Sequence, residues 1–105
     1  MPDKLKAALN ATGLLFAEYA WSEAPRGDYG VYGMGGENDL HANDMHAERA
    51  TEYTVDYFTR RPPAEVVPTI EAALESMEGC AWYLNSVQYE NDSGYLHLEW
   101  VAQVV

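Results

Sequence analysis

The residues best suited to chemistry in this sequence gather in one polar segment, at positions 37–46. It combines histidines with carboxylates, the side-chain types that can bind transition metals. The candidate residues of this segment are Glu37, Asp39, His41, Asp44 and His46. His41 and His46 are five residues apart, which on a helix would place them on different faces, and the short His and Cys spacings of zinc sites are missing. We interpret the segment as a solvated loop that contacts a partner, and predict no metal and no cofactor.

Patterns typical of catalysis are missing elsewhere in the sequence. Asp39 and Asp44 could act as paired carboxylates, but general acid-base chemistry requires a concave site and a raised pKa, which a flexible loop does not provide. The serines lie in no nucleophile-elbow context, and the glycines at 30–36 match no phosphate-binding fingerprint. Cys80 has no evident cationic activator and adjoins a strand-like segment, so we expect a buried thiol. We therefore predict that the protein is not an enzyme.

The charge balance restricts the partners of the protein. Seventeen Asp and Glu against six Lys and Arg give the 105 residues a formal net charge of -11. Such a chain repels phosphate, and its scattered cations form no basic stripe, so we expect no specific binding to nucleic acid. No run approaches the roughly 18 apolar residues of a membrane span, and no signal-peptide core follows Met1. We expect an intracellular product without a membrane partner.

The first half of the chain predicts one helix and two strands within a single domain that covers residues 1–105. Asp3 can cap a helix over residues 3–12, and the following glycine supplies a left-handed stop. Residues 14–21 and 29–32 are apolar and aromatic, with turn residues between them, and are expected to pair as a hairpin. Beyond them, the sequence loses its periodicity up to position 47, which indicates an exposed loop.

Two periodic patterns follow this loop. Residues 48–59 alternate between apolar and polar side chains, as expected for a strand with one buried face. Apolar residues at helical spacing then predict an amphipathic helix that starts between 64 and 68. The glutamates of this helix are most simply its solvated face. In a ring of subunits, Glu71 and Glu75 could instead line a channel through which DNA passes without binding.

The last part of the chain predicts a β-hairpin, with strands at 81–90 and 95–104 around a turn at 91–94. Alternate residues of the second strand, such as Leu98 and Trp100, should form the face that packs against a helix. The complete order is α-β-β-β-α-β-β. It predicts an α+β fold with two layers, in which a mostly antiparallel sheet of about five strands carries two helices on one face.

The chain contains eight tyrosines and three tryptophans, which are many for its length. Most of the tyrosines fall on the expected strands, where aromatic residues are favoured for their cross-strand contacts. Aromatic residues are also enriched at protein interfaces. We favour packing within the sheet, and the surplus also fits a contact between subunits.

Several patterned segments together carry a resemblance to a known family. They are the short first helix, residues 29–33, the polar loop with Asp44, residues 54–60, the Glu-rich helix, and residues 86–90 leading to 97–100. In this order they resemble the tail-terminator and tail-completion proteins of long-tailed bacteriophages over nearly the whole chain. The resemblance implies a hexameric ring that caps the tail tube, stops its growth and joins it to the head.

The resemblance also implies partners and a location. The partners would be further copies of the chain, tail-tube proteins and head-tail connector proteins, with a monomer before assembly as another option. The location would be the head-tail junction of the virion, and the host cytoplasm during assembly. The family has no catalytic residues to carry over, and the two loop histidines are not part of its pattern.

Two other functions remain open on the residues alone. One is an acidic inhibitor that mimics DNA and occupies a nucleic-acid-binding host protein, for which the net charge fits. Against it, the acidic residues are interspersed along regular elements and form no dense run outside the second helix. The other is an enzyme that uses the loop histidines with a metal, which ranks below both.

Overall fold

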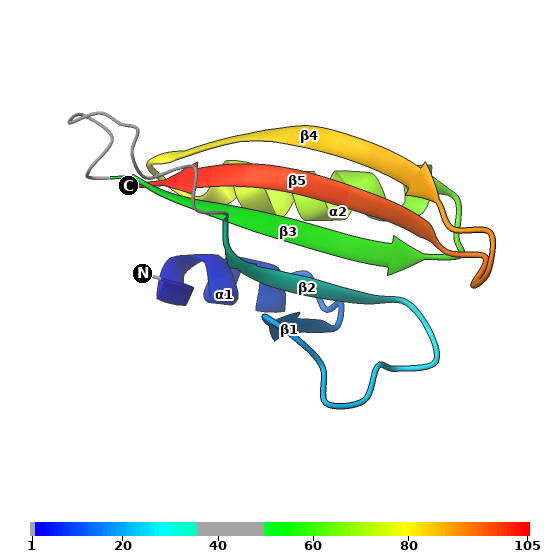
Figure 1. The fold of residues 1–105 in the computed structure, drawn as a ribbon. Helices are drawn as coiled ribbons and strands as arrows, with labels where there is room; N and C mark the ends of the chain where they lie inside the picture. Colours follow the sequence, from blue (N-terminus) through cyan, green and yellow to red (C-terminus); the bar gives the residue numbers. More distant parts are fainter. Residues whose placement is uncertain (1, 36–49) are drawn as a thin grey trace.

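The computed structural model describes residues 2–35 and 50–105 (Figure 1). The elements of these residues are α1 (Pro2–Asn10), β1 (Phe16–Glu18), β2 (Tyr29–Met34), β3 (Thr51–Thr59), α2 (Pro63–Ser76), β4 (Cys80–Tyr89) and β5 (Leu96–Val104). Their order along the chain is the one predicted from the sequence. No helix in this part of the chain is long and apolar enough to cross a membrane.

The strands form one sheet in the order β1-β2-β3-β5-β4. All neighbouring strands run antiparallel except β1 and β2, which are parallel. Both helices lie on the same face of the sheet (Figure 1), and the predicted two-layer α+β fold is confirmed. The two edges of the sheet are therefore β1, at the N-terminal side of the fold, and β4.

The core lies between the helices and the face of the sheet that they cover, which we call the helix side. Val66, Ile70 and Leu74 form the buried stripe of α2, one or two turns apart on the same side of the helix. The residues that meet them from α1 and the strands include Leu5, Leu9, Tyr32, Tyr53, Val55, Tyr57, Leu98, Trp100, Ala102 and Val104. The face predicted to pack for the second hairpin strand is thus confirmed.

Helix α2 contains two prolines, one at its first position and one beyond its first turn. Pro63 occupies its first position, where a backbone N–H would have no partner within the helix. Pro68 lies inside the helix and leaves the carbonyl of Ala64 without its usual donor. Ala64 and Pro68 are both exposed, so water can donate a hydrogen bond to that carbonyl. The helix starts at Pro63, one residue before the range of 64 to 68 in which its start was predicted.

The prediction of a hairpin between residues 14–21 and 29–32 is wrong. β1 is three residues long and runs parallel to β2, with Phe16 opposite Gly30. A tight turn cannot connect parallel strands, and residues 19–28 instead form a wide loop that returns to the start of β2 (Figure 1). The Trp21 indole holds this loop by donating from Nε1 to the carbonyl of Gly30 at 2.9 Å.

Other boundaries differ by a few residues from the predictions. α1 begins at Pro2, so Asp3 lies in its first turn and does not precede it as a cap. The left-handed stop at Gly13 is confirmed by a φ of +80°. β3 begins at Thr51, and the two residues at the start of its predicted range lie outside the described residues. The hairpin of β4 and β5 is confirmed, with Gly94 at φ +78° in its turn.

Candidate protein-interaction site

The structure describes only some of the candidate residues that the sequence analysis identified. Glu37, Asp39, His41, Asp44 and His46 lie outside the described residues. Glu71 and Glu75 lie on α2 and turn toward the sheet, where each contacts a tryptophan. Within residues 2–35 and 50–105, no group of three or more His, Cys, Asp or Glu could hold a metal ion.

Glu71 and Glu75 each accept a hydrogen bond from a tryptophan of the sheet. Trp100 Nε1 donates to Glu71 Oε2 at 2.9 Å, and Trp82 Nε1 donates to Glu75 Oε1 at 2.9 Å. Trp100 is fully buried, whereas the second pair lies near the surface. Glu71 thus satisfies an indole donor that the core would otherwise leave unpaired. Sequence patterns did not reveal this role, because each pair joins a helix to a strand.

The strand β4 forms a long free edge of the sheet, which we call the β4 edge (residues Cys80–Tyr89). None of its residues carries a charge, although the whole chain has a net charge of -11. Exposed edge strands usually carry charges, prolines or bulges that hinder pairing with another chain, and of these β4 has only a bulge. The β4 edge therefore has the properties of a surface that meets another protein.

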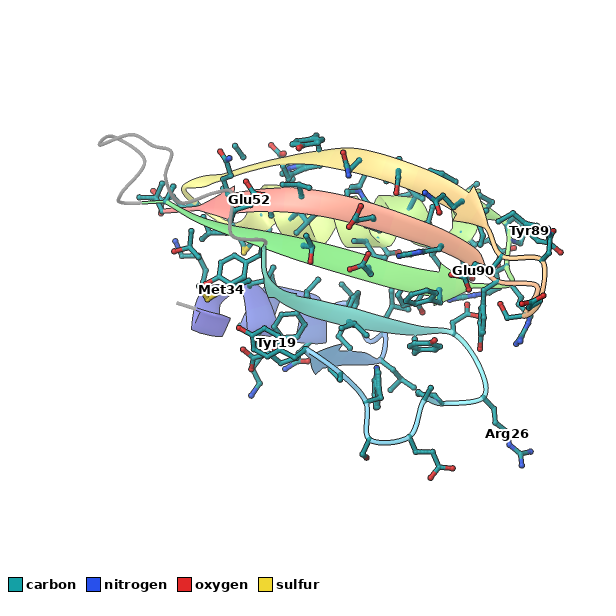
Figure 2. All side chains as sticks on the ribbon, in the orientation of Figure 1. Tyr19, Arg26, Met34, Glu52, Tyr89 and Glu90 are labelled. Carbon is teal, nitrogen blue, oxygen red and sulfur yellow. The ribbon has the colours of Figure 1, made fainter. Side chains whose placement is uncertain are left out.

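Large apolar side chains are exposed along the β4 edge. Leu84, Val87 and Tyr89 pair with helix-side residues of β5 and so point to the helix side themselves. Their exposed fractions are 39%, 51% and 63%, so the helix layer leaves them open to solvent. Tyr89 projects from the end of β4 (Figure 2). Tyr83, which is 54% exposed, adds an aromatic ring on the opposite face.

A β-bulge interrupts the middle of the β4 edge. Leu84 pairs with Trp100 and Ser86 pairs with Glu99, so Asn85 is an extra residue in β4. Its side chain donates from Nδ2 to Glu99 Oε1 at 3.0 Å. The bulge divides the edge into two regular halves, of five and four residues.

The opposite edge of the sheet is short. After β1, Tyr19 takes a φ of +68°, and its N–H donates to the carbonyl of Tyr32 at 2.7 Å. Its ring lies over Gly33, where a Cβ would come within 2.7 Å of ring carbons. On the helix side, the ring of Phe16 lies in the same way over Gly30, where a Cβ would clash with ring carbons. The two glycines of β2 thus leave room for aromatic rings on both faces of the strand next to this edge.

The face of the sheet opposite the helices carries a histidine cluster that sequence reasoning did not single out. His97 Nε2 lies 2.8 Å from Asp56 Oδ1, and its Nδ1 lies 3.7 Å from Glu90 Oε2. The imidazole also stacks on Phe58, with ring centroids 4.3 Å apart. The hydrogen bond with Asp56 raises the pKa of His97, and the surrounding carboxylates add to this effect while burial opposes it. The strand register brings these residues together.

Asp28 organises a polar network at the end of β3. The hydroxyl of the buried Thr59 donates to Asp28 Oδ2 at 2.6 Å, and Arg61 Nε donates to the same oxygen at 2.8 Å. Burial would raise the pKa of Asp28, but these hydrogen bonds and one from the backbone of Arg60 outweigh it and lower the pKa. A shallow pocket of about 360 Å³ beside Asp28 and Arg61 is also lined by Tyr57 and residues 13–15. Its cation and carboxylate are paired with each other, which fits a structural role.

Arg60 joins this end of the sheet to the tip of the second hairpin. Its Nε and Nη2 donate to the carbonyl of Ser93 at 3.2 and 3.0 Å, and its guanidinium lies 3.9 Å from the ring centroid of Tyr95. The hydroxyl of Tyr95 lies 3.1 Å from the carbonyl of Arg26 and 2.8 Å from that of Gly27. The loop 19–28 and the hairpin tip are thus connected by side chains.

Cys80 is only partly buried, in contrast to the prediction of a buried thiol. Burial and then the charge of Glu75 raise its pKa, and the nearby Lys4 partly opposes them. The thiol is therefore kept protonated, which lowers its reactivity.

Among the described residues, the β4 edge is thus an exposed, apolar and uncharged strand, whereas Asp28 and His97 have charged partners within the fold. Such a surface supports binding to protein better than chemistry on a small molecule. Neither a scan against protein-family models nor a search of curated proteins finds a match to this chain.

Proposed function

We propose that this chain is a structural protein of a bacteriophage or prophage virion. It caps or completes the tail tube and joins it to the head, as a subunit of a ring. The observation that carries the proposal is the β4 edge, an uncharged and apolar surface on a strongly acidic chain. The resemblance of the patterned segments to tail-terminator and tail-completion proteins supplies the kind of assembly.

The distribution of charge supports a role in regulated assembly. A net charge of -11 limits non-specific association of the chain through mutual repulsion. At an edge without charges, contact with another protein does not require the desolvation of ionised groups. A tail component must stay soluble until its partner is present, and this combination provides both properties.

The glutamates of α2 bear on the channel hypothesis. Glu71 and Glu75 accept hydrogen bonds from tryptophans of the sheet, which hold both acidic side chains in place on α2. If α2 faces the channel of the ring, these charges would repel the passing DNA. A ring structure with α2 on the outer wall would contradict this part of the proposal.

The proposed function is tested by deleting the coding sequence from the phage or prophage genome. We expect tails of abnormal length, or tails that are not joined to heads, in electron micrographs of lysates. Expression of the wild-type chain from a plasmid should restore complete particles. Normal, infectious particles without the protein would refute the virion role. Salt-sensitive capture of a nucleic-acid-binding host protein would then favour the DNA-mimic alternative.

A further inference from the structure

We infer that two copies of this chain pair through their β4 edges in an antiparallel manner, across a two-fold axis, so that one continuous sheet runs through both copies. This dimer is the state of the free protein in solution. The inference rests on the geometry of the sheet and does not depend on the proposed virion role.

The lengths of the two edges determine which strands can pair. β4 has ten residues, whereas β1 has three and is followed by the turn at Tyr19. A head-to-tail contact would match the ten-residue edge of one copy with the three-residue edge of the next. Pairing of β4 with β4 matches equal lengths, and identical surfaces that meet in this way are related by a two-fold axis. Strands related by an axis perpendicular to the sheet are antiparallel.

The charges identify the occupant of the edge as a second copy of the chain. A site for a basic partner would present free carboxylates. β4 contains none, and Glu75 and Glu99 beside it accept hydrogen bonds from Trp82 and Asn85. Two acidic chains repel each other over most of their surfaces, and this repulsion is smallest where both contact surfaces are neutral. The β4 edge provides ten neutral residues for such a contact.

The exposed side chains on the helix side support the same arrangement. Pairing in the plane of the sheet places the α2 helices of both copies on one face, with the two β4 strands between them. With the axis near the middle of β4, Leu84 of each copy would lie beside Leu84 of the other. Val87 and Tyr89 of each copy would lie against the first half of the other β4, so that all three residues lose contact with water. A partner that only stacked on the opposite face would leave these three residues exposed.

The two-fold contact also limits further growth. Once both β4 strands are paired, the sheet ends on each side at the short edge β1, where Tyr19 and Phe16 cover β2. Strand pairing therefore stops at the dimer. A subunit that enters a ring through β4 would first have to leave the dimer.

The mass of the free protein gives the first test. Light scattering over a concentration series should show a transition to twice the chain mass of 11.7 kDa. Val87→Lys places two positive charges at the paired edge and should raise the dissociation constant about tenfold or more. Met34→Lys is the matched control, because Met34 is equally apolar and exposed but lies on β2. Gln88→Lys, on the opposite face of β4, should act like Val87→Lys if the latter folds poorly.

Cysteine cross-linking tests the geometry. Single cysteines at positions 81, 83, 86 and 88 are introduced in a Cys80→Ala background. Disulfides between copies should form at a position next to the axis, near the middle of β4, and not at positions 81 and 88 near its ends. Leu15→Cys, exposed but far from β4, should give none.

Three results would overturn the inference. They are a monomer at all concentrations, a dimer that the β4 lysines leave unchanged, and cross-linking at β4 no stronger than at position 15. None of these results depends on the deletion phenotype, so a failure of this inference is distinguishable from a failure of the virion role.

Discussion

Replacement of Glu71 by alanine should destabilise the fold through the indole of Trp100. This indole is fully buried, and its Nε1 donates to Glu71 Oε2 at 2.9 Å. A buried donor without a partner costs about 1–3 kcal/mol, and the lost acceptor is a carboxylate, so we expect a loss of about 2 kcal/mol. Glu71→Gln keeps a carbonyl acceptor at the same place and should lose about 1 kcal/mol or less.

Glu75 offers a matched control on the same helix. It accepts from Trp82 at the same distance of 2.9 Å, but this pair lies near the surface, where water can replace the acceptor. Glu75→Ala should therefore cost less than about 1 kcal/mol. The free energy of unfolding is measured by urea denaturation with tryptophan fluorescence, at one protein concentration for all variants because dimerisation affects stability.

Two results would refute this prediction. Equal losses for Glu71→Ala and Glu75→Ala would show that burial of the indole does not determine the cost. A loss below about 0.5 kcal/mol for Glu71→Ala would show that the Trp100 donor finds another acceptor. An increase of the m-value would instead indicate a change in the denatured or native ensemble.

Three further predictions concern the sheet and its polar clusters. The pKa of His97 is raised in the folded protein, so its contribution to stability is complete below the unfolded pKa of 6.5 and is lost as pH rises through the folded pKa. An NMR titration of His97 and unfolding curves on either side of that pH range should show this loss. Asp56→Asn should reduce the dependence of stability on pH in that range. Gly30→Ala should cost about 1–3 kcal/mol because its Cβ would clash with the ring of Phe16, while Gly27→Ala, with open space around it, should be nearly neutral in thermal unfolding. The pKa of Asp28 is lowered in the folded protein, so its contribution to stability is present above the unfolded pKa of 3.8 and is lost as pH falls through the folded pKa. Asp28→Asn should therefore weaken the decrease of stability at acid pH, measured by unfolding curves.

The parts of the fold that were predicted correctly depend on local signals. Gly13 and Gly94 both adopt positive φ at the places where the sequence indicated a helix end and a turn. The alternation of residues in β3 and the helical spacing in α2 are short-range patterns that tertiary structure did not override. The parallel pairing of β1 could not be predicted in this way, because parallel strands lack the short turn that signals a hairpin.

Local sequence patterns predict less of the candidate site than of the fold. The absence of charge in β4 is visible in the sequence, but its position at the edge follows from the strand order, which local patterns do not specify. The pairing of Glu71 with Trp100 joins residues 29 positions apart, and that of Thr59 with Asp28 joins residues 31 apart. Such pairs arise from packing between elements, so no spacing rule within one element indicates them.

The connection between the loop 19–28 and the hairpin tip has a consequence for the order of folding. The hydroxyl of Tyr95 meets carbonyls that lie 68 and 69 positions earlier in the chain. Closing so large a loop is entropically costly until the intervening strands have already shortened the distance. The hairpin of β4 and β5 can form early from local contacts, whereas this end of the sheet must close late. A nascent chain released from the ribosome would therefore complete its fold at Arg60 and Tyr95, after the β4 edge is already formed and able to meet another copy.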